Sequence, residues 1–339
     1  GGLGIGSLKH WVKIDNPLKY NQINESNVWS KVNAMIYSKT ISLNTCDISE
    51  IMKKMYAGEF ICISDKKGLW YQFKGHRWIE LDTPIELRKN CKTEIYRLYR
   101  RAINEYAAKD DADLKKAQQF YKLSDKLRDT GYINSVMKEA NTDFFDSTHK
   151  FYDDLNENHN LICFNNGVYD LSKGVFRPGR PEDKISFCTN IDYVPLNSKD
   201  FSQKIKLDEI KNFISKILPD KDVREYTLTL LSSFLNGSTK NEQFHFWTGS
   251  GGNGKSKLVE FFEECFGDYC CKLPISLLTQ KRKASGSAEP EMAKTKGKRF
   301  VNMQEPSKGS KINGGLLKEL TGGDKISTRA LYKETFEFK

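Results

Sequence analysis

The sequence has few of the residues that build metal-bound or disulfide-linked folds. It contains five histidines, and its eight cysteines are scattered without a single C-x-x-C pair. Zinc-ligand spacing is therefore absent, and scattered cysteines in a chain of 339 residues fit a reducing compartment better than a disulfide scaffold. No apolar run approaches the ~20 residues that a membrane-spanning helix needs, so we expect no membrane partner.

The composition instead favours folded domains with a basic surface. Hydrophobic residues make up 38% and aromatic residues 12%, which is enough for real cores, and the length predicts two or three domains. The formal net charge is +10, and residues 281–339 hold 14 basic and 7 acidic residues, so most of the surplus falls there. A local basic excess favours a polyanionic partner, although an ordinary solvated basic face has the same composition.

Hydrophobic periodicity divides the chain into four predicted segments. They are a mixed β-rich part, a part with helices and a hairpin, a helical layer, and an α/β part. Their predicted bounds are 1–90, 91–200, 201–237 and 238–339. The elements expected before the last segment are strands over 60–63, 70–73 and 75–80, helices over about 92–139, a hairpin over 161–171 that turns at Asn165-Asn166-Gly167, an ordered loop over 174–183, and helices over 207–235 that break at Pro219.

The last segment alternates strand, turn, helix and strand. Residues 243–248 and 300–304 are predicted buried strands, and residues 255–266 form a predicted helix after a glycine-rich turn. This order implies a parallel α/β sheet. The expected fold class is therefore an α/β P-loop NTPase part, preceded by mixed α+β and helical domains.

The sharpest motif is the turn before that helix. Gly249-Ser-Gly-Gly-Asn-Gly-Lys-Ser256 fits G-x-x-x-x-G-K-[ST] and lies between a predicted strand and a predicted helix. Its glycines let backbone N–H groups surround a phosphate, and the helix adds its partial positive charge. We therefore expect ATP and Mg²⁺ as ligands; the alternative is a chance glycine-rich turn. The predicted nucleotide-binding residues are Gly249, Ser250, Gly251, Gly252, Asn253, Gly254, Lys255 and Ser256.

Each polar residue of this site has an expected task. Lys255 is expected to reach the β and γ phosphates, and the Ser256 hydroxyl is expected to hold Mg²⁺. Glu305 follows the strand predicted over 300–304, and it could orient the attacking water or bind the metal ion through water. We therefore predict Lys255 and Glu305 as catalytic residues, and Ser256 and Glu305 as metal ligands. The alternative is that Glu305 is one surface acid among many.

A basic β-rich stretch follows the helix that is predicted to end at Gly322-Gly323. Lys325, Arg329 and Lys333 recur along it. Such a hairpin could present these cations to a phosphate backbone, which gives affinity for DNA without reading its sequence. An ordinary basic hairpin with no partner is the alternative.

Taken together, these features resemble the superfamily 3 helicases, in the poxvirus-type primase-helicase branch of large nucleocytoplasmic DNA viruses and related phage proteins. The likeness rests on residues 249–256, on the strand that ends in Glu305, and on residues 320–333. Residues 165–171 and 176–183 resemble the domain that precedes the helicase in that branch.

The resemblance implies properties that the residues alone do not show. It implies an AAA+-like sheet, a hexameric ring with ATP between subunits, and a hairpin that lines the central channel with Arg329 and Lys333. It implies 3′ to 5′ translocation on single-stranded or forked DNA. The implied partners are an upstream primase domain, to which residues 1–90 would link, or other replication proteins. The expected location is the viral replication site in the host cytoplasm, or alternatively the nucleus.

Two departures from the family pattern matter. Gln304 stands before Glu305 where members often carry a second acid, so Glu305 would serve both tasks or metal binding would rely more on Ser256. The family's sensor asparagine and arginine finger would lie beyond Lys339, so we expect a C-terminally truncated chain that hydrolyses ATP poorly alone.

Two other functions stay open at this point. A P-loop kinase would need an arginine-rich lid and an acceptor pocket, and it would be active as a monomer without DNA. A DNA-binding or loading module that senses ATP without hydrolysing it is kept open by the single acid at Glu305.

Overall fold

The computed structural model describes most of the chain as two compact units. The described residues are 30, 44–64, 68–107, 111–197, 199–238, 240–280, 289–323, 325–329 and 335–338. Unit 1 comprises residues 1–155 and 178–186, and unit 2 comprises residues 156–177 and 187–339. The four predicted segment bounds remain predictions.

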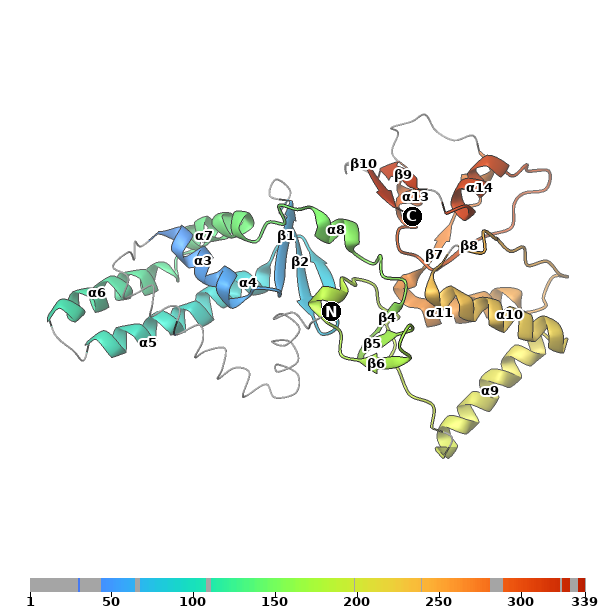
Figure 1. The fold of residues 1–339 in the computed structure, drawn as a ribbon, viewed down its shortest axis with the longest axis horizontal. Helices are drawn as coiled ribbons and strands as arrows, with labels where there is room; N and C mark the ends of the chain where they lie inside the picture. Colours follow the sequence, from blue (N-terminus) through green and yellow to red (C-terminus); the bar gives the residue numbers. More distant parts are fainter. Residues whose placement is uncertain are drawn as a thin grey trace. The chain divides into compact units, whose positions relative to one another are not determined.

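Unit 1 combines helices with one small antiparallel sheet (Figure 1). Its strands, in the order β1-β2-β3, are β1 (Phe60–Ser64), β2 (Leu69–Lys74) and β3 (Arg77–Leu81). Its helical elements are α3 (Thr45–Met55), α4 (Ile85–Asn90), the π-helical turn η1 (Cys91–Ile95), α5 (Tyr96–Ala107), α6 (Asp111–Lys126), α7 (Thr130–Asp143), α8 (Lys150–Asp154) and η2 (Pro181–Asp183).

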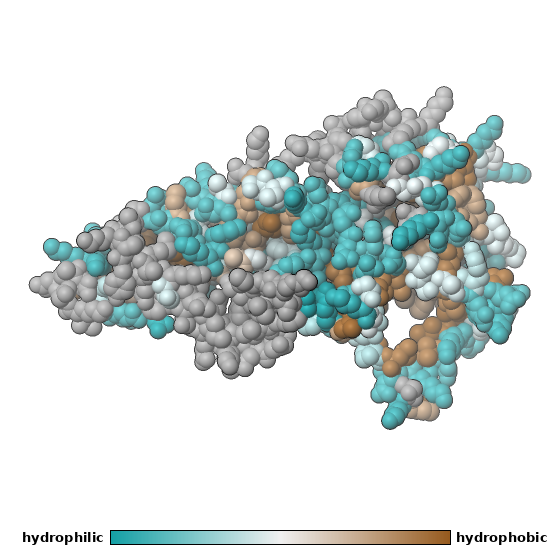
Figure 2. Space-filling view, viewed as in Figure 1, coloured by the Kyte–Doolittle hydropathy of each residue, from teal (hydrophilic) through white to brown (hydrophobic). Residues whose placement is uncertain are grey.

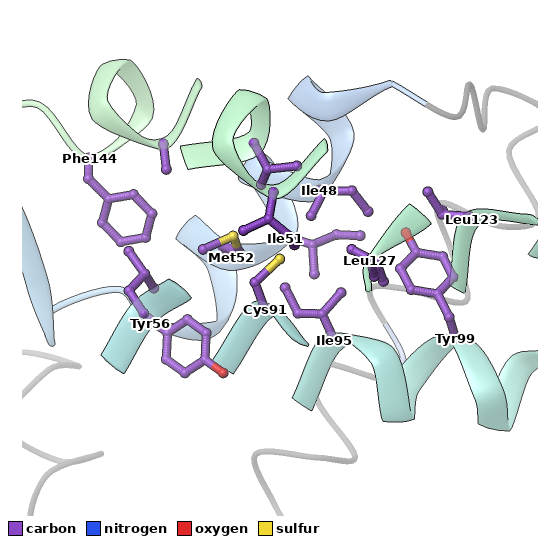
Figure 3. Close-up of a cluster of buried hydrophobic side chains, with 14 of the residues drawn as sticks. Ile48, Ile51, Met52, Tyr56, Cys91, Ile95, Tyr99, Leu123, Leu127 and Phe144 are labelled. Carbon is purple, nitrogen blue, oxygen red and sulfur yellow. The ribbon is translucent and has the colours of Figure 1, made fainter. Parts of the chain in front are cut away.

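The main core of unit 1 lies among these helices (Figure 3), and Phe60, Cys62 and Trp70 of the sheet belong to the same cluster. In α3, Ile48 and Met52 stand one turn apart and are fully buried. They meet Ile95, Leu123 and Leu127 from the neighbouring helical elements. The buried side chains recur at helical spacing, so burial of one face of each helix stabilises the arrangement.

The sheet of unit 1 is buried on both faces. Successive side chains of a strand point to opposite faces, and in β2 Trp70 joins the main core while Tyr71 and Phe73 join a second cluster with Trp78 and Phe151. The predicted strands over 60–63, 70–73 and 75–80 are confirmed as β1, β2 and β3.

Part of the segment 174–183, which was predicted as an ordered loop, packs against this sheet. The backbone N–H of Gly179 donates to His76 Nδ1 at 3.0 Å, and the Trp78 indole donates to Pro181 O at 2.8 Å. A Cβ on Gly179 would stand 2.4 Å from His76 O, so only glycine permits this approach. Residues 178–183 are therefore an ordered part of unit 1, whereas Val175–Arg177, which were also expected in the loop, form the strand β6 of unit 2.

Unit 2 contains three small sheets and a set of helices (Figure 1). Its strands are β4 (Leu161–Phe164), β5 (Gly167–Asp170), β6 (Val175–Arg177), β7 (Cys270–Leu273), β8 (Phe300–Met303), β9 (Ile326–Arg329) and β10 (Thr335–Phe338). Its helical elements are α9 (Phe201–Ile217), α10 (Lys221–Ser233), η3 (Phe234–Asn236), α11 (Lys255–Phe266), η4 (Gly267–Tyr269), α12 (Ser276–Thr279), α13 (Pro290–Ala293) and α14 (Gly314–Thr321).

The predicted hairpin over 161–171 is confirmed, and it packs within unit 2. Phe164 pairs with Gly167 across the Asn165-Asn166 turn, and β6 adds a third antiparallel strand. The Tyr269 hydroxyl accepts a hydrogen bond from Cys163 N at 2.9 Å, and the Arg299 guanidinium donates to Leu161 O at 2.6 Å. These contacts tie the hairpin to the residues that directly precede β7 and β8.

One predicted strand is wrong. Residues 243–248 belong to no strand among the described residues, and Phe244 and Phe246 are 39% and 62% exposed. A strand exists only where its N–H and C=O groups pair with a neighbour. The parallel pair in this unit is β7 with β8, in the register Cys270↔Phe300 to Leu273↔Met303. The described structure is thus mixed α/β with small sheets.

The helices predicted in unit 2 are confirmed. Residues 255–266 form α11, and the layer expected over 207–235 forms α9 and α10. The break at Pro219 has a local cause, because the Asp220 side chain accepts from the N–H groups of Asp222 and Val223 and so begins α10. None of the described helices has the length and apolar character that crossing a bilayer requires.

Candidate nucleotide-binding site

The backbone conformation of the glycine-rich turn requires glycine at some of its positions and not at others. Gly252 and Gly254 have φ of +72° and +83°, the left-handed region that side chains with a Cβ adopt at a cost. A Cβ on Gly251 or Gly252 would meet nothing within 4 Å. The turn therefore has an open side bounded by backbone alone, which fits a phosphate group that approaches main-chain N–H groups.

The ammonium group of Lys255 folds back over this turn. Lys255 is the first residue of α11, and its Nζ donates to Asn253 Oδ1 at 2.8 Å and to Ser250 O at 3.3 Å. A Cβ on Gly249 would stand 3.0 Å from the same Nζ and 2.6 Å from Asn253 Nδ2. The ammonium group of Lys255 thus lies next to both Gly249 and Asn253.

The first turn of α11 begins without a side-chain cap. Its N-cap is Gly254, which has no acceptor to offer, so no side chain of the described chain caps the helix. By contrast, α9, α10 and α14 begin at Asp200, Asp220 and Asn313, whose side chains accept from first-turn N–H groups. The N–H groups at the start of α11, next to the exposed Ser256, remain available to an anion.

Glu305 lies two residues beyond the carboxyl end of β8, in the same unit. Its side chain is exposed, as is that of Gln304 before it. The strand that carries it is fixed to α11, because Asn302 Nδ2 donates to Glu263 Oε1 at 2.6 Å. Lys272 of β7 lies 3.5 Å from the same carboxylate oxygen. Glu305 therefore follows a strand of the parallel pair, while its catalytic and metal-binding tasks remain predictions.

The basic hairpin that was predicted for DNA forms between β9 and β10. Lys325 precedes β9 and is exposed, with its Nζ 3.8 Å from Glu337 Oε2 on β10. Arg329 is the last residue of β9 and pairs in register with Thr335, but its side chain is not among those described. Lys333 lies outside the described residues. The contacts of all three residues with DNA stay predictions.

One neighbour of the turn was not foreseen. The side chain of Ile217, at the end of α9, lies 2.9 Å from the position that a Cβ on Gly254 would take. The sequence signals only that Ile217 belongs to an apolar helical repeat, and nothing in its pattern names a partner so far along the chain. Among the described residues, no group of three or more His, Cys, Asp or Glu side chains forms a metal site.

Comparison with known families finds a match for about half of the chain. A family model described as "D5 N terminal like" matches residues 49–219. The chain belongs to this family. The matched D5 N-terminal-like region covers the described part of unit 1 from residue 49 onward, the sheet β4-β5-β6 and α9, and it ends two residues after Ile217.

The relatives of this D5 N-terminal-like chain come from large DNA viruses. A protein of Acanthamoeba polyphaga mimivirus named as a candidate helicase is 39% identical over 344 residues, which cover 99% of the chain and 35% of the relative. A candidate helicase of Frog virus 3 is 26% identical over 86% of the chain and 40% of the relative. A candidate primase of African swine fever virus is 24% identical over 98% of the chain and 36% of the relative.

These findings confirm the resemblance to primase-helicases of large DNA viruses. The chain spans between about a third and two-fifths of the length of these relatives. Membership of superfamily 3 and the activity of the whole protein therefore remain predictions.

Proposed function

We propose that this chain is the nucleotide-binding part of a superfamily 3 DNA helicase that hydrolyses ATP during viral genome replication. One observation carries the proposal. The uncapped start of α11 follows two left-handed glycines, and the Lys255 ammonium lies across the turn between them. Helix N-termini and glycine turns of this kind supply N–H donors and partial positive charge to phosphate groups.

The residues of the turn divide the work of holding Mg·ATP. The open side at Gly251 and Gly252 accommodates the triphosphate, since no Cβ and no neighbouring atom stands there. Lys255 exchanges its bond to Asn253 for the β and γ phosphates, and Ser256 offers its hydroxyl to the metal ion. When bound, Mg²⁺ would neutralise charge on the phosphates. Glu305 orients the attacking water.

The wider proposal concerns assembly and DNA. Copies of the protein form a hexameric ring with an AAA+-like sheet, and an arginine from a neighbouring copy completes each site. The hairpin β9–β10 presents Lys325, Arg329 and Lys333 to single-stranded or forked DNA, alongside a primase domain or other replication proteins. Support comes from relatives named as candidate helicases and primases and from the basic excess of residues 281–339. The proposed location is the viral replication site in the host cytoplasm.

The decisive experiment is equilibrium binding of Mg·ATP to the 339-residue chain. Lys255→Ala should weaken binding at least about tenfold, because it removes a charge-assisted contact to phosphate. Lys257→Ala is the matched control, since Lys257 is an exposed lysine of the same helix turn that pairs with Glu260 at 2.7 Å. Equal binding by the wild type and Lys255→Ala would show that the site assignment is wrong.

A second candidate function is an ATP-sensing module that loads DNA without hydrolysing ATP. The observation that favours it is the exposed Gln304-Glu305 pair, which offers one carboxylate where two tasks are expected. The two functions differ in turnover. Hydrolysis by the assembled full-length protein that disappears in Glu305→Gln favours the helicase, whereas ATP-dependent DNA affinity without hydrolysis favours the module.

A further inference from the structure

The last turn of α9 lies against the phosphate turn. Three atoms of Ile217, Cγ1, Cδ1 and Cγ2, lie 2.9, 3.3 and 3.5 Å from the position of a Cβ on Gly254. The isoleucine therefore occupies the space behind the glycine. One helical turn earlier, the rings of Phe213 and Phe261 have their centroids 5.8 Å apart, which joins α9 to α11 itself. Helix α9 thus packs against the turn through Ile217 and against α11 through Phe213.

The corner that follows Ile217 is held in place from α10. Arg224 donates from Nη1 to Leu218 O at 2.7 Å and to Pro219 O at 3.1 Å. Such charge-assisted bonds to carbonyl groups at a helix end are stronger than neutral ones. Ile217 cannot leave Gly254 unless this corner moves as well.

We infer that α9 is a positioning element of the phosphate turn, with Ile217 as its positioning residue. The left-handed φ of +83° at Gly254 sets the direction in which the chain enters α11, and Ile217 packs against the residue that makes this change of direction. The inference rests on the proposed nucleotide site. It adds that the D5 N-terminal-like region, which ends at residue 219, maintains the conformation of the turn.

The rest of α9 makes this role separable from folding. Phe201, Ile205 and Ile210 are 76%, 46% and 39% exposed, and Ile214 is the buried side chain of the helix. Figure 2 shows hydrophobic surface among the polar surface in the region of α9. Because most of the helix is exposed, removal of one side chain at its end should leave the core of unit 2 intact.

The test combines a measurement without nucleotide and one with it, both on the 339-residue chain. Ile217→Ala should speed amide hydrogen exchange at residues 254–256 in the absence of ligand. It should also weaken binding of Mg·ATP about tenfold. Ile210→Ala, on the same helix but away from the turn, is the matched control and should change neither. Ile217→Val keeps the β-branched shape and should retain most of the binding.

The possible failures are distinguishable. Exchange and Mg·ATP binding in Ile217→Ala that match those of Ile210→Ala would overturn the positioning role, while a loss of binding in Lys255→Ala would leave the nucleotide site standing. A turn that loosens in Ile217→Ala without any change in Mg·ATP affinity would also overturn it. If Ile217→Ala fails to fold, Ile217→Val decides. Faster exchange at residues 254–256 with a wild-type unfolding midpoint supports the role, whereas unchanged exchange there, or a change no larger than that of a general destabilisation, contradicts it.

Discussion

At the scale of single residues, conformation distinguishes the glycines of the phosphate turn from one another. Gly254 combines a left-handed φ with a close neighbour, whereas Gly251 has neither a left-handed φ nor an atom within 4 Å of its Cβ position. A methyl group at the two positions therefore meets very different surroundings. The motif alone treats both as glycines of one kind.

Gly254→Ala should therefore destabilise unit 2 and weaken Mg·ATP binding. A non-glycine residue in the left-handed region costs on the order of 1–3 kcal/mol, and the new Cβ would also displace Ile217. Gly251→Ala is the control, and it should leave the free energy of unfolding almost unchanged. Denaturant unfolding of both variants measures this difference, and equal losses of stability would contradict it.

His76 provides a residue-scale prediction about pH. Burial lowers the pKa of His76 below its ordinary value near 6.5, and its Nδ1 accepts the Gly179 N–H, which requires that this nitrogen carry no proton. The unfolded chain therefore binds a proton at a higher pH than the folded chain. Stability from His76 is fully present above pH 6.5 and is lost as the pH falls through the lowered folded pKa.

The corresponding experiment compares wild type with His76→Asn. Asparagine keeps an acceptor for Gly179 but does not titrate, so the variant should lose less stability than wild type between pH 7.5 and about 5. Thermal unfolding of both proteins at each pH measures the change. Parallel pH profiles of the two proteins would count against the assignment.

At the scale of elements, the segment that contacts β4 through the Thr189 N–H and Cys163 O is bound to the far end of α11. Asp268, just after α11, accepts from Cys188 N at 3.1 Å and from Asn190 Nδ2 at 2.9 Å. Arg299, just before β8, donates to Leu161 O and Leu235 O and stacks 4.5 Å from the Tyr269 ring. The hairpin and the parallel pair thus share one set of polar anchors.

Arg299→Ala should loosen this junction. It leaves carbonyl groups of Leu161 and Leu235 without their donor, and a hydrogen bond to a charged group contributes roughly 1.5–3 kcal/mol. We expect a loss of that size in the free energy of unfolding, with faster amide exchange at Cys163. Lys294→Ala is the control, because Lys294 is 58% exposed and its ammonium lies 2.9 Å from the carboxylate of Glu291, one turn earlier in the short helix α13. A loss no greater than that of the control would contradict the anchoring role.

At the scale of the whole molecule, the uneven charge predicts how DNA binding depends on salt. Each phosphate neutralised on single-stranded DNA adds about 0.7 to the slope of log affinity against log salt concentration. Lys325→Ala should lower the magnitude of that slope by about 0.7 for a single-stranded oligonucleotide. Lys257→Ala removes another exposed, acid-paired lysine and should leave the slope unchanged. The same slope in both variants would exclude Lys325 from the DNA interface.

The elements that could be predicted from the sequence have local causes. Helix α11 begins at Lys255, directly after Gly254, and α10 begins after its N-cap Asp220. The turn between β4 and β5 is predicted by Asn165-Asn166-Gly167. The strand expected over 243–248 failed because pairing needs a neighbour that local pattern cannot supply. For the site, the motif predicted which residues form the turn, but it did not predict that Ile217 packs against Gly254.

The sequence by itself determined the family, the helices with their caps, the β-rich stretches and the glycine-rich turn, because each depends on residues that are near one another along the chain. Only the tertiary structure decided that Ile217 lies behind Gly254, that Arg299 holds Leu161, and that the hairpin packs with unit 2 rather than with the helices before it. These contacts join residues far apart in sequence, so they depend on which apolar faces and unpaired carbonyl groups meet in the folded chain, and no short pattern records that choice.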